Sequence, residues 1–147
     1  MHRITSILKG RGLKIEHLET CIWAEKELDN TARLVLQVDL PSEEEQYSGW
    51  VRLDDVSGET PTEASFWFEV KNGVANIDYF KSNPTGNGRG SKIYTLAESL
   101  FAALGVKRAE VEPVHSARRL DVIRFWSERG FTRHDKDPRL MYKTIVA

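Results

Sequence analysis

The sequence lacks the features that mark several specialised classes of protein. Its single cysteine, Cys21, excludes an internal disulfide, and the apolar neighbours Ile22 and Trp23 indicate a small buried residue rather than a nucleophile. No apolar run approaches the length of a membrane span, and the first residues lack the apolar core of a secretion signal. Lys and Arg number 21 against 22 Asp and Glu, so the net charge favours neither nucleic acid nor a membrane surface as the main partner. We therefore expect a cytoplasmic protein.

The length of the chain and the absence of repeats bound its organisation. At 147 residues the chain fits one domain, which is large enough to bury a hydrophobic core. No internal repeat or low-complexity tract interrupts the sequence. We therefore expect a single domain that covers residues 1–147.

The N-terminal half predicts mostly extended structure. Residues 1–14 carry four Lys or Arg and no acid, with two glycines, and they predict a basic arm or a short first element. Two extended runs, residues 19–28 and 32–40, flank a polar pair that is typical of a turn, although a helix over residues 16–29 is the alternative. An acidic loop follows, and residues 49–56 predict a short strand.

The clearest local signal is a hairpin in the middle of the chain. The alternating runs 66–71 and 74–80 flank Asn72-Gly73, the kind of dipeptide that two-residue hairpin turns prefer. We therefore expect these two runs to pair antiparallel. The second run leads directly into the glycine-rich stretch 83–92.

A strand, a helix and a second strand follow one another around that stretch. Apolar residues at helical spacing predict a helix over residues 91–104, and Gly105 is well placed to end it. Residues 106–114 then predict a strand. The crossover rule makes this strand parallel to residues 74–80.

The last third of the chain predicts one more helix and a hairpin. Ser116 is a suitable N-cap for a helix that Gly130 stops. Residues 131–134 and 139–146 then predict a final hairpin. Together these elements indicate an α+β fold with a mixed sheet.

Three glycines alternate in the stretch that joins the first hairpin to the first predicted helix. Gly86, Gly88 and Gly90 allow backbone N–H groups to crowd together, and the helix start adds unpaired donors and the positive end of the helix dipole. The charged side chains between Tyr79 and Glu98 are all basic, namely Lys81, Arg89 and Lys92. This composition indicates a site for a phosphorylated ligand.

Spacing distinguishes three kinds of phosphate-binding loop. A P-loop requires Gly-Lys followed by Ser or Thr, whereas the order here is Gly90-Ser91-Lys92. A dinucleotide fingerprint requires G-x-G-x-x-G and several further βαβ units, and this stretch is one residue short of the pattern. The third pattern is R/Q-x-x-G-x-G/A. The chain matches it at Gly88 and Gly90 but has Thr85 where the pattern has Arg or Gln.

This third pattern resembles the pyrophosphate loop of the GCN5-related N-acetyltransferases (GNAT). The segment 125–131, Phe-Trp-Ser-Glu-Arg-Gly-Phe, is similar to the (F/L)-Y-x-x-x-G-F ending of that family. From about Val74 onward, the order of elements resembles the acetyl-CoA-binding half of the family's fold. The resemblance implies a GNAT-like α+β fold, in which antiparallel N-terminal strands precede a β-loop-α-β unit, a second helix and a C-terminal hairpin.

The resemblance also implies a function. It implies an acyl-CoA-dependent N-acyltransferase with acetyl-CoA as co-substrate and a small-molecule amine or a protein amino group as acceptor. It implies no metal, no specific nucleic acid and no membrane, and it leaves a homodimer open. The strand backbone at residues 76–80 would pair with the pantetheine arm, and the loop N–H groups would hold the pyrophosphate. The residues implied in cofactor binding are Tyr79, Phe80, Gly86, Asn87, Gly88, Arg89, Gly90, Ser91 and Lys92.

Two positions that carry a tyrosine and an asparagine in the family are substituted in this chain, so the catalytic groups have to be sought among other residues. Attack of an amine on the thioester needs a base for the amine proton and a donor for the departing thiolate. The family's tyrosine falls on Trp126, whose indole is too weak an acid and which we expect in the core, and its asparagine falls on Arg119. The candidate base is Glu112, with Asp78 and Glu69 as alternatives. The candidate donors are Tyr94, His115 and Tyr79.

Two further functions are open at this point. The substitutions at Thr85, Arg119 and Trp126 favour a non-catalytic module of the same fold that binds acyl-CoA or a protein partner. A nucleotide-binding protein of the Rossmann type is the third alternative. Calorimetry with acetyl-CoA separates the three.

Overall fold

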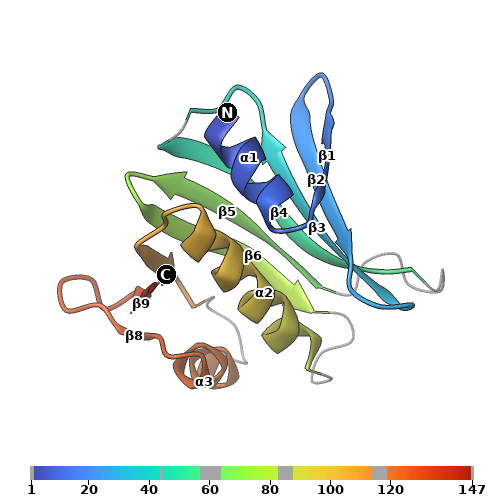
Figure 1. Cartoon of the computed structure of the whole chain (residues 1–147). Coiled ribbons are helices and arrows are strands. Elements are labelled where there is room, and N and C mark those ends of the chain that lie inside the picture. The colour runs from blue at the N-terminus through green and yellow to red at the C-terminus, as the bar shows by residue number, and fades with distance from the viewer. Residues whose placement is uncertain (1, 44, 57–63, 83–87, 114–118, 147) are drawn as a thin grey trace.

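The computed structural model describes residues 2–43, 45–56, 64–82, 88–113 and 119–146 (Figure 1). The helices in these ranges are α1 His2–Gly10, α2 Arg89–Ala103 and α3 Arg119–Glu128. The strands are β1 Lys14–His17, β2 Cys21–Glu27, β3 Ala32–Asp39, β4 Gln46–Asp55, β5 Ala64–Lys71, β6 Val74–Ser82, β7 Arg108–Val111, β8 Thr132–Arg133 and β9 Met141–Thr144.

The described strands form one mixed sheet in the order β1-β2-β3-β4-β5-β6-β7-β9-β8. Neighbouring strands are antiparallel except β6 and β7, which run parallel with Val74 opposite Arg108 and Ile77 opposite Val111. The helix α2 connects these two strands, as the crossover rule requires. The α+β fold class with a mixed sheet is therefore confirmed.

The hairpin of β5 and β6 forms at the predicted turn. Asn72 and Gly73 both have positive φ, 52° and 81°, which is the backbone conformation of the tight turns that suit twisted strands. Lys71 pairs with Val74 directly beside this turn.

The N-terminal half consists of meandering strands after one helix. The two predicted runs become β2 and β3, and the alternative helix over residues 16–29 is wrong. The sheet is preferred because Ile22 and Ala24 alternate with Trp23, so that one face of β2 is buried. The strand β4 begins earlier than predicted, at Gln46.

The first element is a helix rather than an arm. Ile4 and Leu8 lie one turn apart on α1 and are only 3% and 0% exposed, whereas the basic Arg3 and Lys9 are exposed. This amphipathic pattern anchors α1 on the sheet. The helical pattern is short and ends at Gly10, so the sequence was compatible both with a basic arm and with a short first element.

The predicted elements of the last third are present with shorter ends. The strand β7 is limited to Arg108–Val111, and α3, β8 and β9 follow in the predicted order. Ser116, the predicted N-cap, lies outside the described residues.

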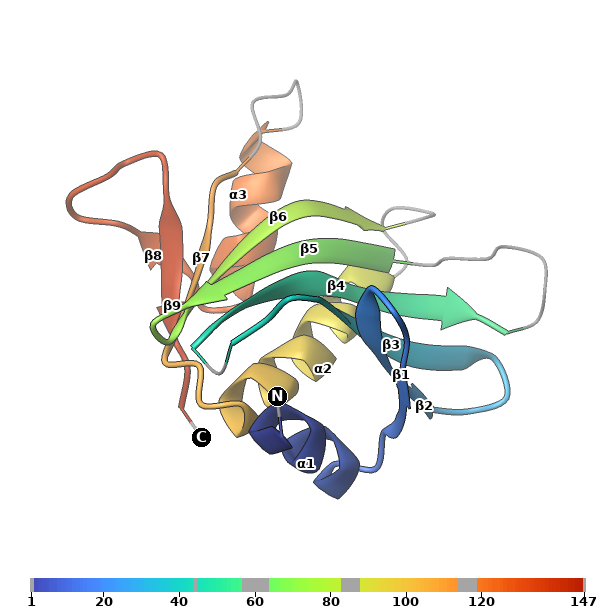
Figure 2. The same cartoon turned by 90° about the horizontal axis from the view of Figure 1, so that it is seen from above.

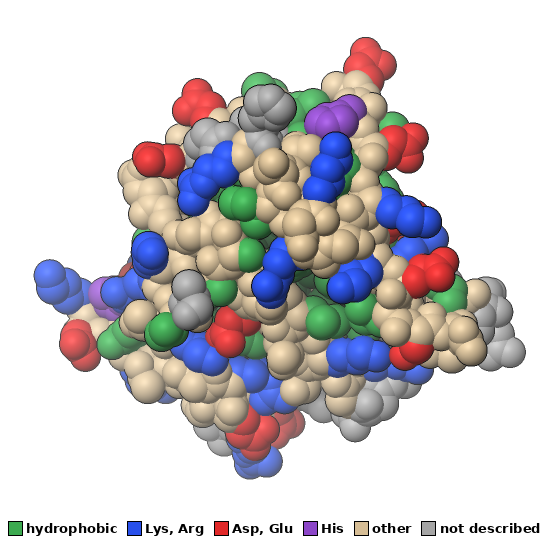
Figure 3. Space-filling model, in the orientation of Figure 1, with side chains coloured by type: hydrophobic (Ala, Val, Ile, Leu, Met, Phe, Trp, Pro, Cys, Tyr) green, Lys and Arg blue, Asp and Glu red, His purple; other side chains and the backbone are tan. Residues whose placement is uncertain are grey.

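The helices α1 and α2 lie on the same face of the sheet (Figure 2). Phe66 and Phe68 of β5 point to this face and contact Phe101 of α2, with ring centroids 6.4 and 5.5 Å apart. Seen from this side, Lys and Arg are spread over the surface while Asp and Glu lie mostly toward its rim (Figure 3). The core therefore sits between the helix layer and one face of the sheet.

Candidate functional site

The candidate site lies where β6 and β7 part. The two strands pair only from Val74 to Ile77 and from Arg108 to Val111, whereas β6 continues to Ser82. Figure 2 shows the two strands diverging beyond that point. Among the described strands none pairs with this side of β6 past Ile77, so its backbone N–H and C=O groups face the gap.

A β-bulge in β6 sits beside the point of divergence. On β5, Ser65 and Trp67 are two residues apart, but their partners Lys81 and Asp78 are three apart, so β6 holds one extra residue. Tyr79 lies in the bulge with a φ of 53°, and its N–H donates to Asp78 Oδ1 at 2.8 Å. Such bulges redirect side chains and are frequent next to binding sites. Sequence patterns did not predict this bulge, because alternation along β6 is nearly regular.

A cavity of about 640 Å³ occupies the gap. It has the size of a cofactor site. Its walls are Ile77, Asp78, Tyr79, Phe80, Lys81 and Ser82 of β6, Gly88, Gly90 and Ser91 around the start of α2, Val111 and Glu112 at the end of β7, and Asp121, Val122, Phe125, Trp126 and Arg129 of α3.

The start of α2 opens into this cavity. Gly88 precedes the helix with a φ of 81° and contributes no side-chain cap, and the first turn of a helix has backbone N–H donors without an intrahelical partner. Gly90 is required for a different reason, because a Cβ there would lie 3.3 Å from the Phe80 ring and 3.4 Å from the Phe125 ring. Gly88, Gly90 and Ser91, three of the residues that the family resemblance implies in cofactor binding, line the cavity.

The other predicted cofactor residues divide into three groups. Tyr79 and Phe80 line the cavity. Arg89 and Lys92 are on the first turn of α2 but not in the cavity wall. The Lys92 ammonium lies 3.8 Å from Oδ2 of Asp29, which is in the turn between β2 and β3. Gly86 and Asn87 lie outside the described residues.

The helix α3 supplies the apolar wall and one cation. Trp126 is 2% exposed and contacts the rings of Phe80, Tyr94 and Phe131 at 5.0, 5.5 and 5.0 Å, so its expected place in the core is confirmed. Arg129 also lines the cavity, and its Nη1 donates to the Phe125 carbonyl at 2.8 Å. Arg129 was not predicted, although its place inside the second family-like segment was a usable signal.

Tyr94, a predicted proton donor, is not part of the cavity wall. It is 1% exposed, and its hydroxyl donates to Glu98 Oε1 at 3.1 Å, an atom that the Lys143 ammonium also contacts at 2.7 Å. Burial, together with the negative charge of Glu98 and the hydrogen bond to it, raises the pKa of the Tyr94 hydroxyl well above its usual range. This environment makes Tyr94 a poorer acid than a free tyrosine. His115 lies outside the described residues.

Glu112, the predicted base, lies where two hollows meet. It lines the main cavity and also a second hollow of about 390 Å³, and the two share Ile77, Asp78 and Val111 as well. Asp78 of β6 therefore lines the same two hollows as Glu112, which follows β7. Glu69 lines neither hollow. The gap between β6 and β7 is thus bordered by two carboxylates.

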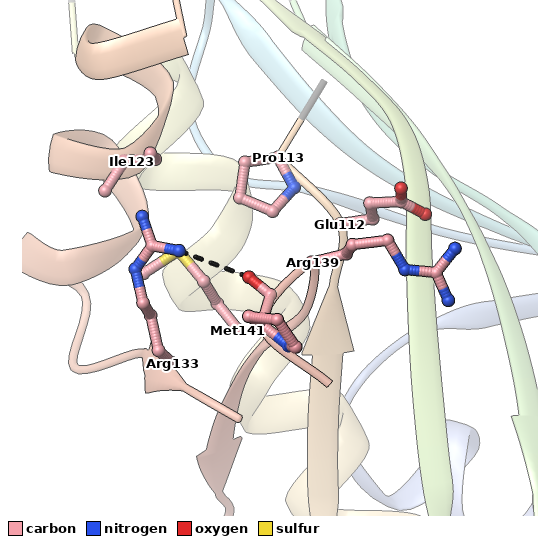
Figure 4. Close-up of a pocket in the computed structure, with 7 residues that line it drawn as sticks. Glu112, Pro113, Ile123, Arg133, Arg139 and Met141 are labelled. Carbon is pink, nitrogen blue, oxygen red and sulfur yellow. Dashed lines mark hydrogen bonds between the residues drawn. The ribbon is translucent and has the colours of Figure 1, made fainter. Parts of the chain in front are cut away.

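A third hollow beside Glu112 is too small for a substrate (Figure 4). Its volume is about 10 Å³, roughly that of one water probe. Arg133 Nη1 donates across it to the Pro138 carbonyl at 3.2 Å. Arg139 is nearby, and hydrogen bonds from its guanidinium to Asp137, followed by the charges of Asp137 and Glu112, raise its pKa.

The described ranges contain neither a candidate metal site nor a candidate membrane span. These residues contain no group of three or more His, Cys, Asp or Glu placed to hold a metal ion. None of the helices described here is long and apolar enough to cross a membrane.

Comparison with solved structures defines the class of fold. No protein-family model matches the sequence, and no curated protein matches it either. The fold, in contrast, is shared with acyl-CoA N-acetyltransferases of known structure, and the chain has a GNAT-like fold.

Three particular structures illustrate the likeness. The first is an acetyltransferase of the GNAT family from Staphylococcus aureus, with a TM-score of 0.55 and 9% identity over 67% of this chain and 68% of that one. The second is the PaiA N-acetyltransferase from Thermoplasma acidophilum in complex with coenzyme A, with a TM-score of 0.53 and 17% identity over 66% and 60% of the two chains. Gcn5 from Tetrahymena has a TM-score of 0.50 and 11% identity over 70% of each chain. At these identities the likeness concerns the fold.

Proposed function

We propose that the chain is an acyl-CoA-dependent N-acyltransferase that uses acetyl-CoA and acts on an amine. One observation carries this proposal. A single cavity of about 640 Å³ joins the unpaired edge of β6 to the N-terminal end of α2. An extended amide chain that ends in phosphates suits such a cavity, since one part offers backbone hydrogen bonds and the other part offers helix N–H donors.

The donor would lie along β6 and end at α2. The pantetheine amides would pair with the free backbone of residues 78–82, and the pyrophosphate would meet the N–H groups that follow Gly88. Lys81 and Arg129 line the same cavity and add positive charge. The coenzyme A complex of a neighbour with the same fold supports this assignment of the ligand class.

The acyl group would then lie at the gap between the two strands. A neutral amine attacks the thioester carbonyl, the carbon–nitrogen bond forms, and collapse of the tetrahedral intermediate breaks the carbon–sulfur bond. Glu112 takes the amine proton, directly or through a water. Tyr79 is the predicted donor that lines the cavity, so its hydroxyl is the group we assign to the departing thiolate.

Two measurements test this proposal in sequence. Isothermal titration calorimetry with acetyl-CoA is expected to show one site per chain, and the absence of binding would contradict the proposal. Release of coenzyme A is then followed with a thiol reagent over a panel of primary amines. Cys21 is the chain's one thiol and is buried, so the background of the native protein is expected to be low.

A non-catalytic acyl-CoA-binding module is the second candidate. It is favoured by Trp126, which stands in the core at the place of the family's tyrosine, and by Tyr94, whose hydroxyl is tied to Glu98 outside the cavity. This candidate predicts that acetyl-CoA binds but that no amine in the panel releases coenzyme A. Release of the thiol with any amine rejects it.

A further inference from the structure

The sheet face opposite α1 and α2 carries an ordered row of aromatic residues. Trp23, Gln37, Trp50, Trp67 and Asp78 are successive cross-strand partners on β2 to β6. Three of the four tryptophans in the chain are therefore on this row. None of the described helices covers β2 to β5 on this face (Figure 2). The row ends at Asp78, which borders the main cavity.

The bulge adds Tyr79 to the aromatic surface. The rings of Trp50 and Tyr79 are stacked with centroids 6.3 Å apart, and Trp50 meets Trp67 edge to face at 5.5 Å. Tyr79 is 66% exposed, an unusual value for a large aromatic side chain that also lines the main cavity. These three residues, Trp50, Trp67 and Tyr79, are called the aromatic platform below. Aromatic rings of this kind offer an apolar contact to a ligand.

One end of the platform is acidic. The hollow of about 390 Å³ beyond Asp78 is also lined by Glu110 and Glu112. Glu110 is neutralised by Arg108, whose Nε lies 3.0 Å away. Among the described residues, Asp78 accepts a hydrogen bond from the Tyr79 N–H through Oδ1 only, and Glu112 lies close enough to Arg139 for its charge to raise the pKa of that residue. Both carboxylates border the main cavity, where the thioester would lie.

The other end of the platform is basic. A hollow of about 300 Å³ is lined by Gln37, Trp50, Arg52, Ser65 and Lys81. Arg52 is held by Asp54, with Nη2 at 2.8 Å from Oδ2. Lys81, in contrast, has no ion-pair partner among the residues that the structure describes, and its side chain is exposed. Within the described part of the chain, Lys81 therefore supplies the unpaired positive charge at this end.

The spacing between the two ends limits the length of a ligand. Asp78 and Lys81 are opposite Trp67 and Ser65, which are two residues apart on β5 and hence about 7 Å apart along the strand. An ammonium group near Asp78 and an anion near Lys81 must then be joined by a spacer of several bonds. The two charged groups of an α-amino acid are too close together for this.

From this arrangement we infer that the acceptor is a zwitterionic amine, with a primary ammonium group at one end and a carboxylate at the other. Its ammonium binds between Asp78 and Glu112, its spacer lies on the aromatic platform, and its carboxylate meets Lys81. This inference rests on the proposed transferase function. The ammonium first loses one proton to Glu112, and the neutral amine then attacks the thioester carbonyl. As the carbon–sulfur bond breaks, the nitrogen loses its second proton to solvent, and the departing thiolate takes a proton from the Tyr79 hydroxyl, so that coenzyme A leaves as the thiol.

The test compares amines that differ only in the distal group. Coenzyme A release is measured with para-(aminomethyl)benzoate against benzylamine, and with a series of ω-aminocarboxylates against the amino alcohols of the same length. We expect the carboxylates to be preferred in kcat/KM by about tenfold or more, the size of one charge-assisted contact. Quenching of tryptophan fluorescence by para-(aminomethyl)benzoate, and not by benzylamine at the same concentration, gives a reading that does not depend on turnover.

Matched variants identify the charge that is responsible. Lys81→Met is expected to lower kcat/KM for the carboxylates to the value of the matched amines that lack the carboxylate, and Lys81→Arg is expected to restore the preference. Lys71→Met, on the same strand face at the other end of β5, is the control and should leave the preference unchanged. Because Lys81 also lines the main cavity, acetyl-CoA affinity of each variant is measured by calorimetry, and the comparison is made at saturating donor.

Three results overturn the inference. The first is equal kcat/KM for amines with and without the carboxylate. The second is an unchanged preference in Lys81→Met. The third is a dimer by light scattering that Trp50→Arg dissociates, since a second copy would then cover the platform. If no amine releases coenzyme A although the donor binds, the transferase proposal fails, which is a separate outcome from equal release with all amines.

Discussion

Glu112 illustrates how one side chain gains a candidate role from its position. It directly follows β7 and borders both the main cavity and the acidic hollow, so its carboxylate can accept a proton from an amine at the gap. The resemblance to the N-acetyltransferases implied Glu112 as one of three candidate bases. Because β6 and β7 diverge, Glu112 and Asp78 border the gap, whereas Glu69 does not.

Replacement of Glu112 tests the base. Glu112→Gln keeps the shape and removes the acceptor, so kcat is expected to fall by about a hundredfold or more, the usual contribution of a general base. Glu69→Gln is the matched control on a neighbouring strand and should change kcat little. Steady-state rates of coenzyme A release at saturating acetyl-CoA provide the measurement. An equal loss in both variants would contradict the assignment.

Tyr94 is expected to affect stability rather than turnover. Its pKa is raised in the folded protein, first by burial and then by Glu98, so the folded state holds the hydroxyl proton more tightly than the unfolded chain does. Stability is therefore complete below the ordinary tyrosine pKa of about 10 and falls as the pH rises above it. We expect the free energy of unfolding of Tyr94→Phe to fall less steeply between about pH 9.5 and 11 than that of the wild type.

Urea unfolding at a series of pH values measures this difference. The variant also loses the hydrogen bond to Glu98, which lowers its stability by about 1 kcal/mol at neutral pH. Identical pH slopes for the two proteins would show that Tyr94 ionises in the folded state as it does in the unfolded chain.

At the scale of elements, the start of α2 depends on two glycines for different reasons. Gly88 has a positive φ with open space around it, and Gly90 has ordinary φ but close aromatic neighbours. The sequence motif treats both as one pattern. The structure assigns the first to backbone conformation and the second to packing.

Substitution of Gly88 tests the role of this helix start. Gly88→Ala forces a side chain into the left-handed region and is expected to lower the free energy of unfolding by about 1 kcal/mol and to weaken acetyl-CoA binding several-fold. Gly10→Ala is the control, because a Cβ there meets nothing within 4 Å and no positive φ is involved. Calorimetry and chemical unfolding measure the two effects. Unchanged affinity in a folded Gly88→Ala protein would mean that the ligand does not use this loop.

The contact between β3 and β4 depends on Gly49. A Cβ at this position would collide with the carbonyl oxygen of Gln37 on the neighbouring strand, where neither backbone can move without loss of the pairing. Gly49→Ala is therefore expected to destabilise the protein by about 4 kcal/mol or more, or to prevent folding. Ser48→Ala, one residue earlier, should change stability little. Thermal unfolding of both variants checks this, and a small change in Gly49→Ala would show that the strands can separate locally.

At the scale of the whole molecule, the donor should stabilise the fold because it bridges separate elements. The cavity is lined by β6, α2 and α3, and the unfolded chain offers no such site. At about a hundredfold excess over Kd, a ligand selective for the folded state adds about 2.7 kcal/mol, which corresponds to a rise in Tm of several degrees.

Pantetheine provides the control for this measurement. It retains the amide chain and lacks the phosphates, so it is expected to raise Tm less than coenzyme A at equal concentration. Equal shifts would contradict a phosphate site at α2. Differential scanning fluorimetry is suited to the comparison, because Trp126 sits in the core beside the cavity.

The order of elements could be predicted because its signals are local. The Asn72-Gly73 turn, the helical spacing of apolar residues in α2 and the single crossover determined the hairpin, the helix and the parallel pair of β6 and β7. The glycine pattern likewise located Gly88, Gly90 and Ser91 in the cavity wall. Each of these features depends on residues close together in the chain, and their patterns have few alternatives.

What the sequence left open was decided by contacts between distant segments. The aromatic platform requires the register of three strands, and the acidic gap requires β6 and β7 to part after Ile77. The Tyr94 hydroxyl is outside the cavity because it donates to Glu98, which Lys143 also contacts. Local pattern predicts which residues share a face of one element, but not which face meets a cavity formed by other elements. The composition and spacing of this chain thus determined most of its elements and their order, whereas the tertiary packing decided which of its acids, tyrosines and tryptophans surround the gap.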